Sequence, residues 1–123
     1  MAAFLSNDWF AAVRADDVDL ADVLIESTVT GAPGSDVRWH VQVRGGTVTA
    51  EAGGVPDADV ALTSTYDVAV AILRGDLAPS VAFMQGRMKT AGDPGKLLEL
   101  LRSTAGPGYE AFRDAVAATT TFS

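Results

Sequence analysis

The stretch DADVALTSTYDVAVAILRGDLAPSVAFMQGRMKTAGDPGKLLELL, residues 57–101, changes its hydrophobic period part of the way along. Its first residues alternate, with Val60 and Leu62 on the same side, which indicates a strand with one buried face. From Ser64 onward the apolar residues follow helical spacing instead. The stretch therefore predicts a strand that leads directly into a helix, and this change of period is typical of a fold that combines a sheet with helices.

Capping and turn residues divide the rest of this stretch into further elements. Gly75 is placed to end the first helix, and Pro79 is expected to open a second, short one. Gly86 then ends that helix, and the segment 87–91 is predicted to be another strand. Asp93 is expected to cap a third helix, which carries a row of leucines.

Upstream of this stretch, three more strands are predicted from alternating side chains. They cover residues 23–29, residues 37–43 and residues 47–52. A turn is expected between the first two, and the pair Gly45 and Gly46 suits a tight hairpin between the last two. Because each connection is too short for a crossover helix, we expect an antiparallel meander of about four strands, which residues 87–91 extend to five.

Two terminal helices complete the expected fold. One begins near Asn7, and the other follows a Gly-Pro-Gly break and carries Tyr109, Phe112 and Val116 at helical spacing. The expectation is one α+β domain over residues 1–123, with a five-stranded, mainly antiparallel sheet covered on one face by about five helices.

Composition and charge narrow the range of partners. The chain has 123 residues, of which 48% are hydrophobic and 20% charged, as in an ordinary globular domain. A net charge of −7 argues against nucleic acid, because phosphate recognition depends on clustered lysine and arginine. For the same reason we expect at most transient contact with a membrane. The first residues lack the pattern of a signal peptide, so we expect a cytoplasmic protein.

Catalytic and metal-binding patterns are weak in this sequence. Cysteine is absent, which excludes thiolate chemistry. His40 falls on the solvent-facing side of its strand, and a catalytic role would also need a nucleophile and a carboxylate within reach. The acidic segment 16–22 lacks the glycine-turned loop of a calcium site and is predicted to be a solvated connector. We therefore expect no catalytic residue, no metal and no cofactor.

Aromatic and methionine side chains gather in one part of the predicted fold. Phe83, Met84 and Met88 belong to elements that would face the sheet at Trp39 and Val41. Methionine adapts to irregular space, so such a cluster is typical of an adaptable cavity. It is also typical of a filled core, and the residue pattern leaves both alternatives open.

The stretch of residues 57–101 is similar to the signature half of the sterol carrier protein 2 family. The resemblance rests on a strand with an acidic lead-in, a helix that ends in glycine and a short proline-containing link. It continues with Phe-x-Gln-Gly at residues 83–86, a basic-apolar-basic strand at 87–89, the pair Gly92 and Asp93, and a leucine helix. The combination is more specific than any of its parts.

The resemblance extends over about residues 4–118 and leaves a short tail at 119–123. It implies an apolar tunnel between sheet and helices that holds a sterol, a fatty acid or an acyl chain, with Gln85 as its polar anchor. The candidate ligand-binding residues are Trp39, Val41, Val48, Leu62, Ile72, Phe83, Met84, Gln85, Met88, Leu97, Leu101 and Phe112.

The function that the resemblance implies is the non-enzymatic binding or transfer of an apolar small molecule. The alternative is a protein-interaction or accessory subunit whose apolar groove receives a partner or shields the substrate of an enzyme, because one fold can serve several functions. Recognition of coenzyme A is not expected. Of the local cations Arg87, Lys89 and Lys96, strand alternation directs the first two away from Met88. The sequence leaves the oligomeric state open.

Overall fold

A six-stranded sheet forms one layer of the computed structural model, which describes residues 2–32 and 35–122. Its strand order is β2-β5-β4-β3-β6-β7, and a separate parallel pair joins β1 to β8. The strands are β1 Ala2–Ala3, β2 Arg14–Ala15, β3 Val23–Thr30, β4 Val37–Arg44, β5 Thr47–Ala52, β6 Val60–Thr65, β7 Met88–Gly92 and β8 Thr120–Thr121. The helices are α1 Asn7–Ala12, α2 Tyr66–Arg74, α3 Pro79–Met84, α4 Pro94–Thr104 and α5 Pro107–Ala118.

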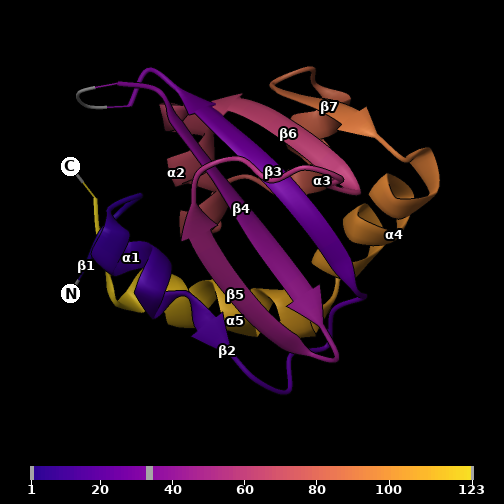
Figure 1. Ribbon diagram of the computed structural model, residues 1–123, viewed down its shortest axis with the longest axis horizontal. Coiled ribbons are helices and arrows are strands. Elements are labelled where there is room, and N and C mark those ends of the chain that lie inside the picture. The colour runs from indigo at the N-terminus through magenta and orange to yellow at the C-terminus, as the bar shows by residue number, and fades with distance from the viewer. Residues whose placement is uncertain (1, 33–34, 123) are drawn as a thin grey trace.

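The helices α2 to α5 lie on one face of the sheet, and α1 lies beside β5 (Figure 1). The expected α+β class is therefore confirmed. The sheet has one strand more than expected, because the two-residue β2 pairs with the edge of β5 at Ala15 and Val48. A strand of two residues is too short to produce an alternating pattern that sequence analysis could detect.

The expectation of a simple antiparallel meander is wrong at one connection. Strand β6 pairs in parallel with β3, so the chain leaving β5 must cross two strands before it pairs again. Residues 53–59 make this crossing over the sheet face that carries no helix (Figure 1). Gly53 N donates to Arg38 O over 2.8 Å, and Val55 N donates to Glu26 Oε2 over 3.1 Å. A loop hydrogen-bonded to the open face replaces the crossover helix.

The acidic lead-in to β6 has a structural explanation. Asp59 N donates to Leu24 O, and Leu24 N donates to Asp59 Oδ2 over 2.9 Å, so one residue aligns the start of β6 with β3. The carbonyl of Asp59 also accepts from Asp93 N at the end of β7. Asp59 thus sets the register of three adjacent strands.

The capping residues expected from the sequence are confirmed at three helices. At α2 the expected Gly75 ends the helix in the left-handed region with a φ of 83°, and the N-cap is Thr65, whose Oγ1 accepts from Val68 N. Asp93 Oδ1 accepts from the backbone at the start of α4. Pro79 occupies the first turn of α3. Because such caps act within four residues, they are visible in the sequence alone.

The two ends of the described chain lie side by side (Figure 1). Strands β1 and β8 pair there, and the Trp9 indole Nε1 donates to the buried Thr120 Oγ1 over 3.0 Å. The segment after α5, expected to be a short tail, therefore contributes a strand. The expected turn at residues 31–36 falls partly outside the described residues.

Candidate functional site

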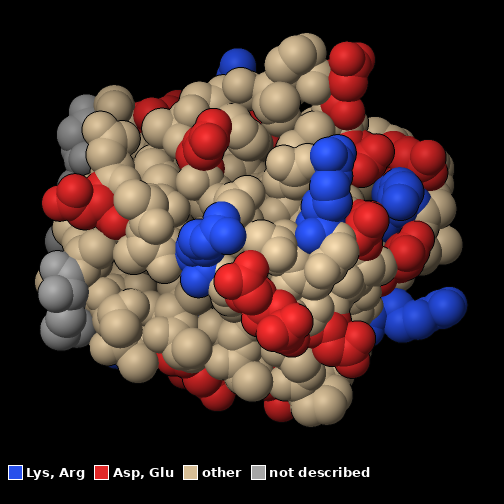
Figure 2. Space-filling model, turned by 60° about the horizontal axis from the view of Figure 1, so that its bottom comes forward, with Lys and Arg blue, Asp and Glu red and all other residues tan. Residues whose placement is uncertain are grey.

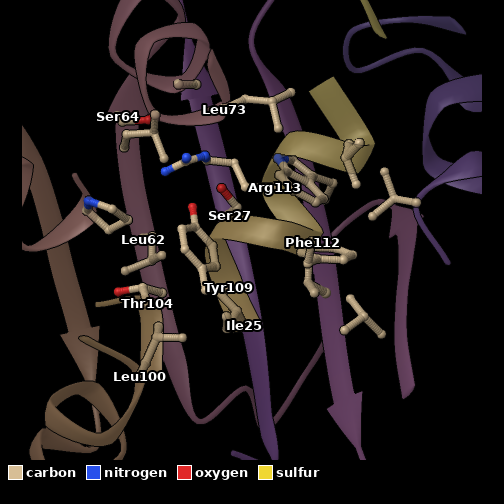
Figure 3. A pocket seen from close by; sticks show the side chains of 18 of the residues that line it. Ile25, Ser27, Leu62, Ser64, Leu73, Leu100, Thr104, Tyr109, Phe112 and Arg113 are labelled. Carbon is tan, nitrogen blue, oxygen red and sulfur yellow. The ribbon is translucent and has the colours of Figure 1, made fainter. Parts of the chain in front are cut away.

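A cavity of about 230 Å³ lies between the sheet and the helices (Figure 3). Its floor is the helix-facing side of β3 to β7. Odd-numbered residues of β3 and β4 point into it, as the alternation of their sequences predicts. The lining residues from the strands are Ile25, Ser27, Val29, Trp39, Val41, Val43, Val48, Leu62, Ser64 and Met88.

The roof of the cavity comes from α2, α4 and α5. In α4 the lining side chains are Leu97, Leu100, Leu101 and Thr104, and in α5 they are Tyr109, Phe112, Arg113 and Val116. Both sets follow the spacing i, i+3, i+4, i+7, which places them on a single helix face. Leu98, which lies off this face, is exposed to solvent.

An aromatic wall closes the end of the cavity near α1. The ring centres of Phe4 and Trp9 are 5.0 Å apart, and those of Trp9 and Trp39 are 5.2 Å apart, both in edge-to-face geometry. Such pairs add stabilisation beyond their buried area. All three rings line the cavity, so both tryptophans of the chain are natural fluorescent reporters of its contents.

Nine of the twelve candidate ligand-binding residues lie at this cavity. They come from strands and helices that are distant in sequence, so their convergence is a result of the fold. They are Trp39, Val41, Val48, Leu62, Ile72, Met88, Leu97, Leu101 and Phe112. That they contact a ligand stays a prediction.

The other three candidates lie outside the cavity. Met84 is 81% exposed, and Gln85 is exposed at the end of α3, so neither projects between the layers. Phe83 packs against the small cluster that contains Leu77 and Met88. The placement of Gln85 as a polar anchor within the cavity is therefore wrong. Helix α3 is six residues long, and only Ala82 of it is buried.

The structure adds polar lining residues that the sequence analysis did not select. They are Ser27, Ser64, Thr104, Tyr109 and Arg113. The sequence could have indicated Arg113 as a lining residue, because it lies in the apolar stripe of α5 between Phe112 and Val116. Ser27 and Ser64 likewise take inward positions in alternating strands.

Tyr109 titrates unusually because it is buried. Burial raises the pKa of its phenol to about 12, although the positive charge of Arg113 lowers it in part. An unfolded tyrosine titrates near pH 10, so above this pH the unfolded chain loses a proton that the folded chain keeps. The Tyr109 phenol is therefore a hydrogen-bond donor at every physiological pH.

We expect this titration to reduce stability in alkali. Between about pH 10 and pH 12 the free energy of unfolding should fall by roughly 1–3 kcal/mol more in the wild type than in Tyr109→Phe. Urea denaturation of both proteins across this range measures the difference, because the other titrating groups are shared. An identical pH dependence in the two proteins would contradict the assigned burial.

His40 lies on the opposite face of the sheet from the cavity, as its alternation predicts. It is not fully solvated, however. Its Nδ1 lies 2.9 Å from Gly53 O in the crossing loop, and its Nε2 lies 3.6 Å from the Glu51 carboxylate. The contact with Gly53 connects His40 to the crossing loop, and the contact with Glu51 connects it to β5.

The acidic segment before β3 contributes hydrogen bonds to a neighbouring hairpin. Asp22 Oδ1 accepts from Gly45 N over 2.9 Å, and Asp16 Oδ1 accepts from Thr47 Oγ1 over 3.0 Å. Among the described residues no group of three or more histidine or acidic side chains is arranged to hold a metal ion. None of the described helices is long and apolar enough to cross a bilayer.

The face of the molecule in Figure 2 mixes acidic, basic and uncharged side chains. Lysine and arginine form no continuous area on that face, and acidic side chains flank them. This distribution matches the net charge of −7. It offers no extended basic surface of the kind that binds a phosphate backbone.

The fold and the cavity define a class of protein, a small α+β domain that encloses an apolar pocket between its layers. A family model described as the SCP-2 sterol transfer family matches residues 12–102. The chain belongs to this family. Sterol carrier protein 2 of Gallus gallus is 28% identical over 78 residues, which cover 63% of this chain and 14% of that protein. The chain thus spans about one seventh of the length of this relative.

Solved structures agree on the fold. A conserved hypothetical protein of Thermus thermophilus, described as a candidate sterol carrier protein, matches with a TM-score of 0.70 and 16% identity over 93% of this chain and 90% of that chain. The sec-alkylsulfatase Pisa1 of Pseudomonas sp. matches with a TM-score of 0.51 and 23% identity over 79% of this chain and 14% of that chain. The same fold therefore also occurs as a small part of an enzyme.

Proposed function

We propose that this protein binds one apolar small molecule, such as a sterol, a fatty acid or a similar lipid, in the cavity between its sheet and its helices, and transfers it without chemical change. The observation that carries the proposal is the cavity itself, because its walls are almost entirely aliphatic and aromatic. Membership of a family described by sterol transfer supports the same reading. Burial of each methylene group would contribute roughly 0.8 kcal/mol to affinity.

The size of the cavity bears on the ligand. A volume of about 230 Å³ is smaller than the roughly 300–1,000 Å³ that is common for ligand pockets. A narrow, flexible acyl chain needs less widening of the cavity than a rigid sterol ring system. The geometry therefore favours a single acyl chain.

Filling the cavity from its floor should weaken ligand binding. Leu62 points into the cavity, whereas its neighbour Thr63 is exposed on the opposite face of the same strand. We expect Leu62→Phe to weaken fatty acid binding at least about 10-fold, because a larger side chain occupies the ligand's space. The matched variant Thr63→Phe adds a ring at the outer face and should bind within about 2-fold of the wild type.

Native mass spectrometry before and after addition of a fatty acid measures this uptake, and tryptophan fluorescence provides an independent reading. Freshly purified protein should carry a mass of a few hundred daltons that organic solvent extracts. The proposal fails if neither the purified protein nor the protein mixed with fatty acids or sterols carries any added mass. Equal uptake by the two phenylalanine variants would also argue against this cavity.

A second candidate function, an interaction or accessory subunit, is favoured by one surface feature. Large apolar side chains are exposed on α3 and α4, which contact each other. They are Val81, Met84 and Leu98. Two results together would favour this function over the carrier. The protein would take up no lipid, and its measured mass would increase from that of one chain to that of an assembly as the protein concentration rises.

A further inference from the structure

A cationic side chain lines the largely apolar cavity. The guanidinium of Arg113 lies beside Tyr109, with Cζ 5.9 Å from the centre of the phenol ring (Figure 3). Only 17% of its side-chain surface is exposed. Withdrawing a charge from water is costly unless it is paired and hydrogen-bonded, so the partners of this group decide what it does.

Asp114 is a hydrogen-bond partner of Arg113, and it occupies only part of the guanidinium. Nε and Nη2 of Arg113 donate to the same oxygen of Asp114, over 3.2 and 3.0 Å. Within residues 2–32 and 35–122, Nη1 donates to no acceptor. Asp114 is itself 67% exposed and does not line the cavity. A pair with such an exposed carboxylate contributes little, because solvent screens it.

Three hydroxyl groups share this side of the cavity. Ser27 and Ser64 project from β3 and β6, and the hydroxyl of Tyr109 points toward Arg113 (Figure 3). None of the three side-chain hydroxyls takes part in a hydrogen bond within the described part of the chain. Ligand pockets are mostly apolar with a few converging polar groups that orient the ligand, so four polar groups with unused hydrogen-bonding capacity on one side of this cavity indicate a place for a polar group of the ligand.

The guanidinium lies against the end of α2. A Cβ built on Gly75 would approach Cζ and Nη2 of Arg113 to 3.1 Å, so glycine lets the side chain lie close to the backbone there. The carbonyl end of a helix also attracts a cation. Glycine at this position therefore leaves room for the cationic group beside the end of α2.

We propose that this protein selects apolar molecules that carry a carboxylate, and that the carboxylate is bound inside the cavity by the Nη1–Nη2 edge of Arg113 and the hydroxyls of Tyr109, Ser27 and Ser64. The inference rests on the proposed function, since it names the ligand class of the same cavity. The planar guanidinium matches a carboxylate with two parallel hydrogen bonds. A neutral alcohol of the same length offers no charge to this edge.

The test compares dodecanoic acid with dodecan-1-ol at pH 8, where the acid is ionised, using tryptophan fluorescence and native mass spectrometry. The readout is the ratio of the two dissociation constants in each protein. We expect the wild type to prefer the acid at least about 10-fold, and Arg113→Met to lose most of this preference, because hydrogen bonds to charged groups are the strong ones. Arg113→Lys, which keeps the charge but not the planar edge, should be intermediate.

The variant Asp114→Asn is expected to change the preference for the acid in the opposite direction from Arg113→Met. It removes the carboxylate that competes for Arg113, so the preference for the acid should increase by about 3- to 10-fold. If Arg113 and Asp114 were only a structural pair, this variant would leave the preference unchanged. The variant also keeps the inference testable if Arg113→Met does not fold.

The outcomes separate this inference from the function on which it rests. Equal binding of acid and alcohol by the wild type, or an acid preference that survives in Arg113→Met, overturns the carboxylate site and leaves the carrier function standing. Binding of neither probe by the wild type overturns both.

Discussion

Replacing Trp9 with alanine is expected to lower the free energy of unfolding by about 3–5 kcal/mol, the usual cost of removing a large buried ring. Trp9 is 4% exposed and packs edge-to-face on Trp39. Its indole also donates to Thr120, so the loss would disconnect α1 from the strand pair at the chain ends. Urea denaturation followed by circular dichroism measures the change without depending on the deleted fluorophore.

The matched control is Trp9→Phe. It keeps most of the apolar contact and removes the hydrogen bond to Thr120, so we expect a loss of only about 1–2 kcal/mol. Thr120 Oγ1 still donates to Val116 O in this variant and is not left without a partner. If Trp9→Ala costs less than about 1 kcal/mol, α1 and the aromatic wall are not part of the cooperative core.

The second large effect is expected at Gly92, the last residue of β7. Its φ of 112° lies in a region that favours glycine, and a Cβ built there would approach Asp59 O to 2.5 Å. We expect Gly92→Ala to cost about 2–5 kcal/mol, as the sum of backbone strain and overpacking against a strand that cannot yield. Thermal or urea denaturation measures it.

The variant Gly53→Ala separates the cost of backbone strain from the cost of overpacking. The φ of 94° at Gly53 is similar, but a Cβ there would meet no atom within 4 Å. Gly53→Ala should therefore show the conformational cost alone, roughly 1–3 kcal/mol. Equal losses at the two positions would mean that the close approach of Asp59 to Gly92 adds nothing.

Much of the local structure could be predicted from the sequence. The alternation of residues 37–43 identified the side of the strand that faces the cavity, and Gly75, Pro79 and Asp93 marked helix ends that the structure confirms. These signals are local, since a cap or a strand face depends on residues a few positions apart.

The candidate site was predictable to the extent that it follows from the same patterns. Trp39, Val41 and Leu62 reach the cavity because they occupy the apolar positions of regular elements. The prediction for Gln85 was wrong because the apolar spacing within a six-residue helix does not determine how that helix is oriented against the sheet. Arg113 was overlooked because a charge within an apolar stripe is ordinarily assigned to the surface.

The sequence by itself determined where the helices and the longer strands form and which face of most of them is apolar, because propensity, period and capping act over a few neighbouring residues. Only the tertiary structure decided that β6 pairs in parallel with β3, that the crossing loop runs over Arg38, and that Arg113 lies within the cavity. The physical reason is that strand partners and helix directions are selected by packing and hydrogen bonds between distant segments, and no local pattern records these choices.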